Sequence, residues 1–359
     1  MKLLLVAAAN SIHTRRWAHA FAEHGHEVHV VSQHAPREPY GSDVRIHLLP
    51  HHGGLGYVLN RAAARRIANG IRPDAINAHY ASGYGTLAPR IEGVPLILNV
   101  WGSDVYEFPD TSLLHRWLLR RNLLRADAVV STSRVMAERT RLICPDLAAI
   151  DVVPFGVDTE RFSPMPKADG PLVIGTVKTL APKYGIDTLI QAFGLIAHES
   201  GLEQSRLRLV GDGPQRKPLE ALARSLRITD RVDFIGNVPH DRVPAELLKL
   251  DVYAALSRRD SESFGVAVIE ASACGLPVVV SRVGGLPEVV DEGRSGLVVP
   301  KEDPKAAADA LLSLARDASL RKSMGEAGRA LVLARYAWSD CVDRQLTVIE
   351  AAIETMRWS

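Results

Sequence analysis

Residues 154–171, Pro-Phe-Gly-Val-Asp-Thr-Glu-Arg-Phe-Ser-Pro-Met-Pro-Lys-Ala-Asp-Gly-Pro, separate two halves of the chain that have the same sequence rhythm. Four prolines and two glycines in this stretch exclude a continuous helix or a central strand. We therefore predict a linker here, with one domain before it and another after it.

Short runs rich in Val, Ile and Leu alternate with longer amphipathic stretches on both sides of the linker, as in βαβ units. The strands expected before it are 2–8, 27–32, 44–49, 75–78, 96–100, 128–131 and 150–153. Those expected after it are 172–177, 206–210, 232–235, 251–255, 277–281 and 296–299. The pattern predicts an α/β protein of two doubly wound, Rossmann-like domains facing a central cleft, because ligands bind at the C-terminal ends of such strands.

The composition is that of a globular protein, with 359 residues, 47% hydrophobic and 23% charged. A net charge of +2 gives no field for binding nucleic acid by counterion release. Three cysteines without a CxxC spacing argue against a disulfide framework and indicate a reducing, cytoplasmic location. The apolar start of the chain imitates a signal peptide, but a buried first strand explains it better because a helical pattern and a second strand follow.

Residues 260–277, Asp-Ser-Glu-Ser-Phe-Gly-Val-Ala-Val-Ile-Glu-Ala-Ser-Ala-Cys-Gly-Leu-Pro, contain two glutamates eight positions apart. We place Glu262 at the mouth of a helix and Glu270 about two turns inside it, so ~12 Å of helix axis separates them. Carboxylates accept hydrogen bonds from hydroxyl pairs, and the amides of residues 263–266 at the helix start suit a diphosphate. Taken alone, the pattern also fits an ordinary helix with a solvent-facing glutamate.

This stretch and residues 278–290 resemble the donor motif of the family 4 retaining glycosyltransferases of the GT-B fold, also called glycosyl transferases group 1. Residues 153–162, 209–214 and 232–236 resemble further motifs of the same family. The resemblance implies that Glu262 contacts the hydroxyls of the donor sugar and Glu270 contacts the ribose. It implies a donor-binding set that also includes Ser263, Phe264, Gly265, Val266 and Gly211. It further implies that the backbone of Ile235, Gly236 and Asn237 contacts the base of the nucleotide.

GT-B proteins also end in a helix that returns to the first domain, and residues 335–350 have the pattern of a final helix. We therefore expect an acceptor-binding domain of residues 1–165 plus 340–359 and a donor-binding domain of residues 166–339.

A loop with two cations is expected to neutralise the departing diphosphate. Lys178 and Lys183 follow a predicted strand, although the family usually has an Arg and a Lys before the glycine of this loop, where Tyr184 stands here. We assign both lysines to the diphosphate. We expect no metal and no cofactor other than the sugar nucleotide, because no HExxH or complete dinucleotide motif occurs and Gly211-Asp-Gly213 lacks a third glycine.

Eleven of the 13 histidines lie at or before His115, which draws attention to the first domain. His13 and His79 fall at strand ends, with a structural role about as plausible as a functional one. Trp101 stands where the family often has a histidine, and we assign it to shaping the sugar or acceptor pocket. Asp104, in the same loop, is our candidate for binding an acceptor hydroxyl, and we count His79 and Asp104 with Glu262 and the two lysines as catalytic.

Residues 112–125 combine four arginines with a Leu/Trp stripe and no acid. Such a helix either packs its leucines on the core or lies on an anionic membrane, and both interpretations stay open. The second would place the protein on the inner face of the membrane, near a lipid-linked acceptor.

These features predict a retaining glycosyltransferase that moves a hexose or N-acetylhexosamine from a nucleoside diphosphate sugar, with UDP favoured, to a hydroxyl acceptor in polysaccharide or glycolipid biosynthesis. Two alternatives stay open: a nucleotide-sugar epimerase of related fold and a non-catalytic nucleotide-binding subunit. Product formed without an acceptor would indicate the first, and nucleotide-stabilised melting without turnover would indicate the second.

Overall fold

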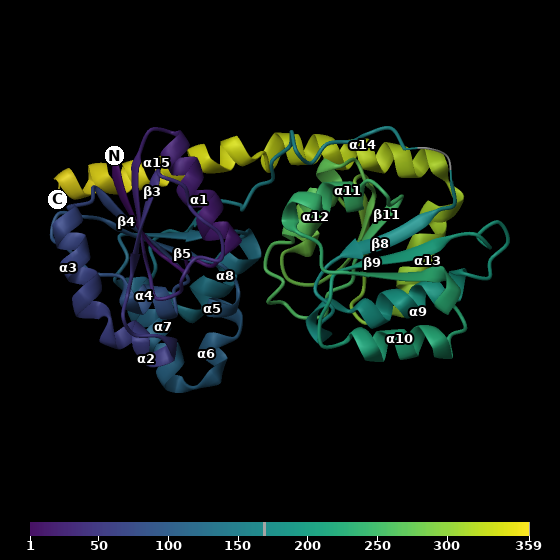
Figure 1. Cartoon of the computed structure of the whole chain (residues 1–359), viewed down its shortest axis with the longest axis horizontal. Helices are drawn as coiled ribbons and strands as arrows, with labels where there is room; N and C mark the ends of the chain where they lie inside the picture. The colour runs from purple at the N-terminus through teal and green to yellow at the C-terminus, as the bar shows by residue number, and fades with distance from the viewer. Residues whose placement is uncertain (168–169, 359) are drawn as a thin grey trace. The chain divides into compact units, whose positions relative to one another are not determined.

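The computed structural model of the chain describes residues 1–167 and 170–358. They form two compact units, one of Met1–Phe155 together with the residues from Ser339 onward, the other of Gly156–Trp338 (Figure 1). The division therefore falls between Phe155 and Gly156, not after residue 165 as expected from the sequence.

The start of the linker belongs to the second unit because it is bound there. Val157 donates its backbone N–H to the carbonyl of Tyr336 at 2.8 Å, and Trp338 donates to the carbonyl of Val157 at 2.9 Å. The guanidinium of Arg329 donates to the carbonyl of Thr159 at 3.0 Å. The prolines of the linker thus break the secondary structure without freeing the segment from the second unit.

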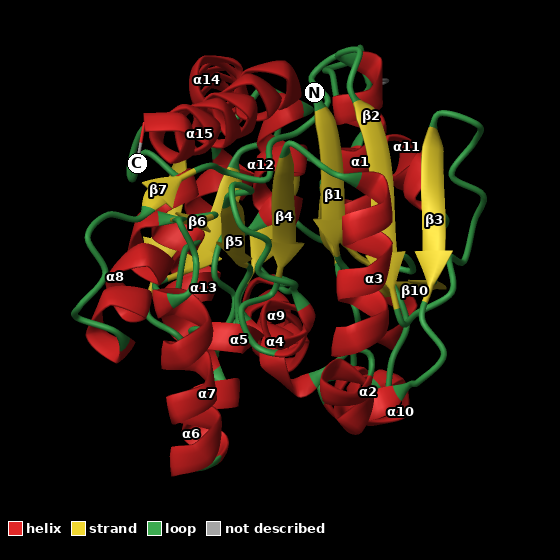
Figure 2. Ribbon diagram, turned by 90° about the vertical axis from the view of Figure 1, so that its left-hand side faces the viewer, coloured by secondary structure: helices red, strands yellow, loops and turns green. Residues whose placement is uncertain are grey.

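The first unit contains a seven-stranded parallel sheet in the order β3-β2-β1-β4-β5-β6-β7. Figure 2 shows the arrows of β1 to β4 pointing the same way. Its strands are β1 (Lys2–Val6), β2 (Glu27–Ser32), β3 (Val44–Leu48), β4 (Ala75–His79), β5 (Leu96–Val100), β6 (Ala128–Ser131) and β7 (Asp151–Val152). The apolar start of the chain is the buried strand β1 inside this sheet.

Helices cover this sheet and complete its core. They are α1 (Ile12–Glu23), α2 (Gly53–Leu59), α3 (Arg61–Ile71), α4 (Gly83–Leu87), α5 (Ser103–Tyr106), α6 (Phe108–Thr111), α7 (Leu113–Leu124), α8 (Arg134–Ile143) and α15 (Trp338–Trp358). From Ser339 onward α15, yellow in Figure 1, belongs to this unit. Ser112 and Ser133 cap α7 and α8, since each side chain accepts a backbone N–H of the first turn.

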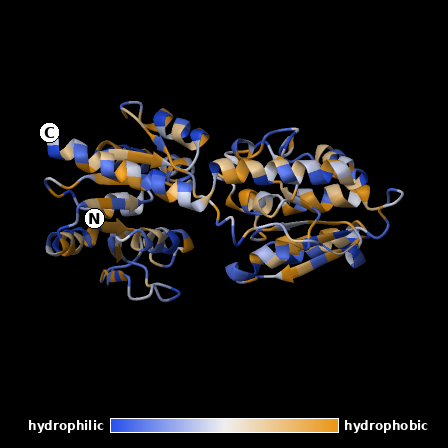
Figure 3. Ribbon diagram, turned by 90° about the horizontal axis from the view of Figure 1, so that it is seen from above, coloured by the Kyte–Doolittle hydropathy of each residue, from blue (hydrophilic) through white to orange (hydrophobic). Residues whose placement is uncertain are grey.

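The second unit contains a six-stranded parallel sheet in the order β10-β9-β8-β11-β12-β13. Its strands are β8 (Val173–Val177), β9 (Arg206–Val210), β10 (Val232–Gly236), β11 (Val252–Ala255), β12 (Val278–Ser281) and β13 (Gly296–Val299). All six lie where the sequence predicts them, with ends that differ by one residue at most. Figure 3 shows strands coloured mainly toward the hydrophobic end of the scale, as expected of strands buried on both faces.

The helices of the second unit include short 3₁₀ turns beside the strand ends. The elements are η1 (Pro182–Tyr184), α9 (Ile186–Ile196), α10 (Arg216–Ser225), η2 (Thr229–Arg231), η3 (His240–Arg242), α11 (Val243–Leu247), α12 (Val266–Ala273), η4 (Leu286–Val289), α13 (Pro304–Arg316) and α14 (Ala318–Arg335). Their apolar faces enclose a core centred on Ile190, Phe193 and Leu209. None of the helices within the described residues has the length and apolar character needed to cross a bilayer.

Candidate functional site

The order of the second sheet reverses between β8 and β11, and the loops after these two strands therefore diverge. In open α/β sheets this is the point where ligands bind. Lys178 directly follows β8, and the segment 256–265 follows β11. The topology thus brings two of the segments selected from the sequence to one edge of the sheet.

Lys178 and Glu262 form an ion pair at this edge. The Nζ of Lys178 donates to Oε1 of Glu262 at 2.9 Å, and the Glu262 side chain is almost fully buried. Lys178 also lies over the ring of Tyr184, with Nζ 4.6 Å from the ring centroid. A residue assigned to the diphosphate and one assigned to the sugar are therefore in direct contact in the described structure.

Two opposing influences act on the ammonium of Lys178. Burial, the larger single influence, lowers its pKa, but Glu262, Tyr253 and Tyr184 together outweigh burial and hold the pKa above its ordinary value. The ammonium is therefore charged at neutral pH. It has three N–H donors, so its bond to Glu262 leaves capacity for a phosphate oxygen.

Lys183 supports the loop that carries Glu262. Its Nζ donates to the carbonyl of Ser261 at 2.9 Å, and its own carbonyl accepts the backbone N–H of Arg258 at 2.9 Å. The structure therefore shows Lys183 joining η1 to the loop 258–262, a role that the sequence did not indicate. Its assignment to the diphosphate stays a prediction.

The helix α12 begins later than the sequence predicts. Gly265 precedes it with φ 95°, a left-handed conformation that suits glycine, and this turn sets the helix start at Val266. Glu262 consequently lies in the loop, and Glu270 lies just over one turn inside the helix. The expected position two turns inside was wrong, and the ~12 Å estimate along a common axis loses its basis.

Glu270 faces the protein and not the solvent. It is 6% exposed, and its Oε1 lies 3.2 Å from Nε2 of His240, the first residue of η3. The interpretation of Glu270 as an ordinary solvent-facing glutamate is therefore wrong. A nearly buried carboxylate needs hydrogen-bond partners, and His240 is one of them.

The remaining predicted donor residues surround the two glutamates. Gly211 pairs with Gly236 across a short bridge, its N–H 2.8 Å from the carbonyl of Gly236. Asn237 accepts the backbone N–H of Asp212 at 3.0 Å, and Ile235 is partly exposed beside it. The segment 235–237, which is predicted to contact the nucleotide base, is thus hydrogen-bonded to the loop after β9.

The start of α12 is well packed. Ser263 and Phe264 are buried, and Phe264 contacts the ring of Tyr336 with centroids 5.7 Å apart. Val266 is the first helical residue. The backbone of this segment remains the predicted diphosphate contact, while the side chain of Phe264 serves packing.

An aromatic cluster lies at the corresponding reversal of the first sheet, between β1 and β4. Trp101 is at its centre, with ring centroids 4.2 Å from His79, 5.3 Å from Tyr80 and 5.1 Å from Phe155. His13, in the first turn of α1, stacks on Phe155 at 4.3 Å. The structure therefore brings His13, His79 and Trp101 together, as members of one packed group.

His79 is buried and neutral in this cluster. It is 1% exposed, and its Nδ1 has no hydrogen-bond partner among the described residues. Burial, with a smaller contribution from His13, lowers its pKa to about 3. At neutral pH this side chain carries no charge, but it can still donate or accept a hydrogen bond.

Asp104 is committed to the protein backbone. Its carboxylate accepts N–H groups from Ala81 at 2.8 Å, Trp101 at 3.1 Å and Gly102 at 2.8 Å, and the residue is 1% exposed. Burial raises its pKa, and these backbone hydrogen bonds oppose the rise. The geometry gives Asp104 the role of holding the loop after β5 and does not support the predicted contact with an acceptor hydroxyl.

The predicted basic helix is α7, and both interpretations of it stay open. Leu119 and Leu123 are fully buried, as core packing requires. Leu113, Leu114 and Trp117 are nevertheless 87%, 68% and 56% exposed, and Arg121 lies over the Trp117 ring. An exposed apolar group beside arginines is more than core packing explains.

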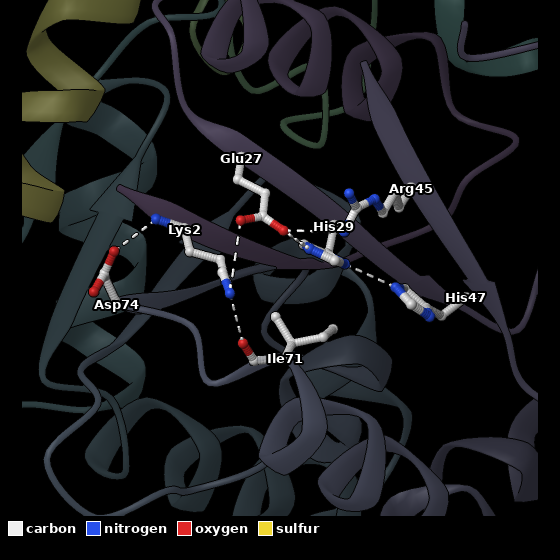
Figure 4. A network of polar contacts seen from close by, with 7 residues as sticks. All are labelled: Lys2, Glu27, His29, Arg45, His47, Ile71 and Asp74. Carbon is white, nitrogen blue, oxygen red and sulfur yellow. Dashed lines mark hydrogen bonds and ion pairs between the residues drawn. The ribbon is translucent and has the colours of Figure 1, made fainter. Parts of the chain in front are cut away.

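A second group of histidines lies within the sheet of the first unit, on β2 and β3. His29 is buried between Oε1 of Glu27 at 3.0 Å and Nε2 of His47 at 2.9 Å, and Lys2 joins the network through Glu27 (Figure 4). Burial lowers the pKa of His47, and His29 adds to this effect. The network ties β1, β2 and β3 together within the sheet, so part of the histidine excess is structural.

No set of three or more His, Cys, Asp or Glu side chains within residues 1–167 and 170–358 is grouped as a metal site would require. The three cysteines are free and buried.

Family comparisons agree with both halves of this description. Residues 157–331 match the model "Glycosyl transferases group 1", and residues 2–133 match "Glycosyl transferase 4-like". A GDP-mannose-dependent alpha-(1-6)-phosphatidylinositol monomannoside mannosyltransferase of Mycolicibacterium smegmatis is 35% identical over 272 residues, 71% of this chain and 69% of the relative. The chain belongs to the family 4, GT-B glycosyltransferases.

Solved structures support the same fold. Sucrose-phosphate synthase of Thermosynechococcus elongatus has a TM-score of 0.85 at 21% identity, over 99% of this chain and 100% of that one. Anabaena HepE in complex with UDP has a TM-score of 0.83 at 18% identity, over 98% and 100%. These structures support the fold, two Rossmann-like domains. The family match and the 35% identical relative make the protein a glycosyltransferase, which favours neither the epimerase nor the non-catalytic alternative.

In this glycosyltransferase, His240 and the aromatic partners of Trp101 were not predicted from the sequence. His240 lies three residues after Asn237, the end of the segment predicted to contact the nucleotide base. This proximity could have identified His240 as a candidate. Tyr80 and Phe155 follow strands that were predicted, but nothing in their spacing shows that their rings meet.

Proposed function

We propose that this glycosyltransferase acts with retention on a nucleoside diphosphate sugar held in the second unit. The observation that carries the proposal is the Lys178–Glu262 contact at the sheet reversal. It places a permanent cation beside a buried carboxylate, one suited to a diphosphate and the other to sugar hydroxyls. Glu270 would bind the ribose and the backbone of residues 235–237 the base.

The proposed reaction needs no protein nucleophile. The bond between the anomeric carbon and the diphosphate oxygen breaks, and the acceptor oxygen forms a bond to the same face of that carbon. The leaving diphosphate takes the proton of the acceptor hydroxyl. Lys178 would stabilise the charge that develops on the diphosphate, which is the main catalytic contribution expected of such a site besides orientation.

Two donors have support. The sequence resemblance favoured UDP sugars, and the solved structure of Anabaena HepE contains UDP. The mycobacterial relative is named for GDP-mannose and is the more similar in sequence. We therefore propose a hexose donor on UDP or GDP.

A lipid-linked acceptor is proposed from two independent observations. The relative is named for a phosphatidylinositol monomannoside acceptor. In this chain, α7 exposes Leu113, Leu114 and Trp117 among arginines, which suits the surface of an anionic membrane. The proposed setting is glycolipid or polysaccharide biosynthesis at that surface.

The proposal is tested with the purified enzyme and a panel of UDP, GDP, ADP and TDP sugars. A thermal-shift screen identifies the nucleotide, and nuclear magnetic resonance of the product gives the anomeric configuration. We expect one donor class to raise the melting temperature and the product to keep the configuration of the donor. An inverted product contradicts the mechanism, and loss of activity in EDTA contradicts charge neutralisation by lysine without metal.

A further inference from the structure

The carboxylate of Glu270 has a partner that the family motifs do not include. Glu270 projects from the second turn of α12, and His240 approaches it from η3, at the end of the loop that follows β10. Their atoms Oε1 and Nε2 are 3.2 Å apart, and Glu270 is nearly buried while His240 is about one-third exposed. The histidine therefore contacts the carboxylate and keeps part of its own surface in solvent.

His240 is itself held by the segment that precedes the second sheet. The guanidinium of Arg161 donates to the backbone carbonyl of His240 at 2.8 Å. The ring of Phe162 lies 5.9 Å from the His240 ring, and Phe162 is buried. Both residues belong to the stretch 153–162, which matched a family motif without an assigned role.

Arg329 fixes this segment to the helix that carries Glu270. It donates to the carbonyls of Phe162 and Ala273, each at 2.6 Å, and Ala273 is the last residue of α12. A continuous set of contacts thus runs from α12 through Arg329 and Phe162 to His240 and back to Glu270. Such a closed path limits the movement of the imidazole relative to the carboxylate.

We propose that His240 is a positioning residue that orients the Glu270 carboxylate for recognition of ribose, and that it thereby makes the enzyme select ribonucleotides over 2′-deoxyribonucleotides. The proposal rests on the proposed function, in which Glu270 binds the ribose. A carboxylate offers two oxygens, and the imidazole N–H occupies one of them, which fixes the direction in which the other presents its lone pairs. Without this contact the carboxylate rotates, and the hydroxyls lose a preorganised acceptor.

The test measures the dissociation constants of UDP, GDP and their 2′-deoxy counterparts by calorimetry, using the full chain. For the nucleotide that binds, we expect the wild type to prefer the ribose form by roughly tenfold to a hundredfold, the range of a hydrogen bond to a charged group. His240→Ala is expected to lose most of this preference. His240→Gln is expected to keep part of it, because its amide can still donate a hydrogen bond.

Two further variants keep the test decisive. His240→Phe retains the ring contact with Phe162 but has no N–H, and it is expected to lose the preference as His240→Ala does. His198→Ala removes an exposed histidine of the same unit and is expected to change nothing. A merely structural role of His240 would weaken both nucleotide forms equally and leave their ratio unchanged.

The outcomes separate this inference from the proposed function. If Glu270→Ala abolishes the preference while His240→Phe retains the wild-type ratio, the positioning role is overturned and the ribose assignment survives. If the wild type binds both forms equally, the inference fails, while the ribose assignment is then judged by Glu270→Ala alone, because the 2′-deoxy form keeps a 3′-hydroxyl.

Discussion

The two glutamates of the donor segment are in different surroundings, and their substitution should therefore have different effects. Glu270→Ala is expected to raise the dissociation constant of the nucleoside diphosphate by roughly tenfold or more, because a hydrogen-bond acceptor for the ribose is lost. Glu262→Ala is expected to lower kcat with the sugar donor and to change nucleotide binding less. Calorimetry and steady-state kinetics measure the two effects, and equal binding by the wild type and Glu270→Ala would contradict the ribose assignment.

His79 should make the stability of the protein depend on pH. Its pKa is about 3 in the folded state, while an unfolded histidine titrates near ~6.5. Because the folded pKa is the lower one, the stabilisation is complete above ~6.5 and is lost as the pH falls toward 3. One such group contributes about 1.4 kcal/mol per pH unit over that window.

The variant His79→Asn should therefore show a flatter dependence. We measure the free energy of unfolding in urea at about pH 7 and at about pH 4.5, a range over which one histidine of this kind titrates in the unfolded state. On lowering the pH, this free energy is expected to decrease less for His79→Asn than for the wild type. Parallel curves for the two proteins would show that His79 gains its proton in the folded state as readily as in the unfolded one.

Residue types and spacing selected the side chains that we propose for donor binding, but not what each one contacts. Glu262 and Glu270 were selected by spacing and resemblance, while the partners Lys178 and His240 come from other strand ends. Asp104 illustrates the reverse. Its carboxylate looked available in the sequence, yet three backbone N–H groups from two loops occupy it, and such tertiary contacts leave no mark on local sequence.

At the level of elements, the loop 258–262 that carries Glu262, here called the donor loop, depends on a close approach between two backbones. A Cβ at Gly284 would lie 2.3 Å from the carbonyl oxygen of Glu262, so the loop after β12 and the donor loop can only pack with glycine there. Gly284→Ala is expected to displace Glu262 and to lower kcat/KM by at least about tenfold, since misplacement by 1 Å can cost about a hundredfold.

Gly293→Ala is the matched control for this substitution. Gly293 also has a positive φ, 80°, but a Cβ there would meet nothing within 4 Å. Both variants carry backbone strain, and only Gly284→Ala adds crowding at the donor loop. Similar activities of the two variants would argue against a role of this packing in catalysis.

The helix α7 should bind membranes through its exposed apolar residues. The double substitution Leu114→Ser with Trp117→Ser is expected to reduce pelleting with vesicles of anionic lipid at low salt. Stability should change little, because exposed positions usually contribute within about 0.5 kcal/mol. Leu142→Ser on α8 is the control, since Leu142 is 72% exposed and lies outside the basic helix. A wild type that fails to pellet would remove the basis for membrane contact.

Strands were more predictable than helix starts in this protein. Every described strand falls at a predicted run, because strands buried on both faces need continuous Val, Ile and Leu. The start of α12 was placed too early, since the positive φ of Gly265 and not the hydrophobic pattern sets it. A glycine within an apolar helical pattern can lie inside the helix or mark its end, and only its backbone dihedral angles distinguish the two cases.

For the whole molecule, the residues proposed to bind the donor all belong to the second unit. Hydrogen exchange of the full chain should therefore slow on addition of the preferred nucleoside diphosphate mainly in residues 178–185, 235–240 and 260–270, because bound ligand suppresses local opening. The same measurement without nucleotide provides the reference. Protection restricted to residues 1–155 would place the nucleotide in the wrong unit for our proposal.

The two-domain organisation followed from the repeated rhythm of strands and helices, while the position of the division did not. Prolines and glycines mark where regular structure stops, but not which unit holds the segment. That depends on contacts such as those of Arg329 with Thr159 and Phe162, which are distant in sequence.

The first unit is built from two separated pieces of chain, Met1–Phe155 and the residues from Ser339 onward. Cys341, Val342 and Ile349 of the second piece are fully buried. During translation, the ribosome delivers Gly156–Trp338 before this piece emerges. The first unit therefore keeps an apolar surface uncovered until the residues from Ser339 onward have been synthesised.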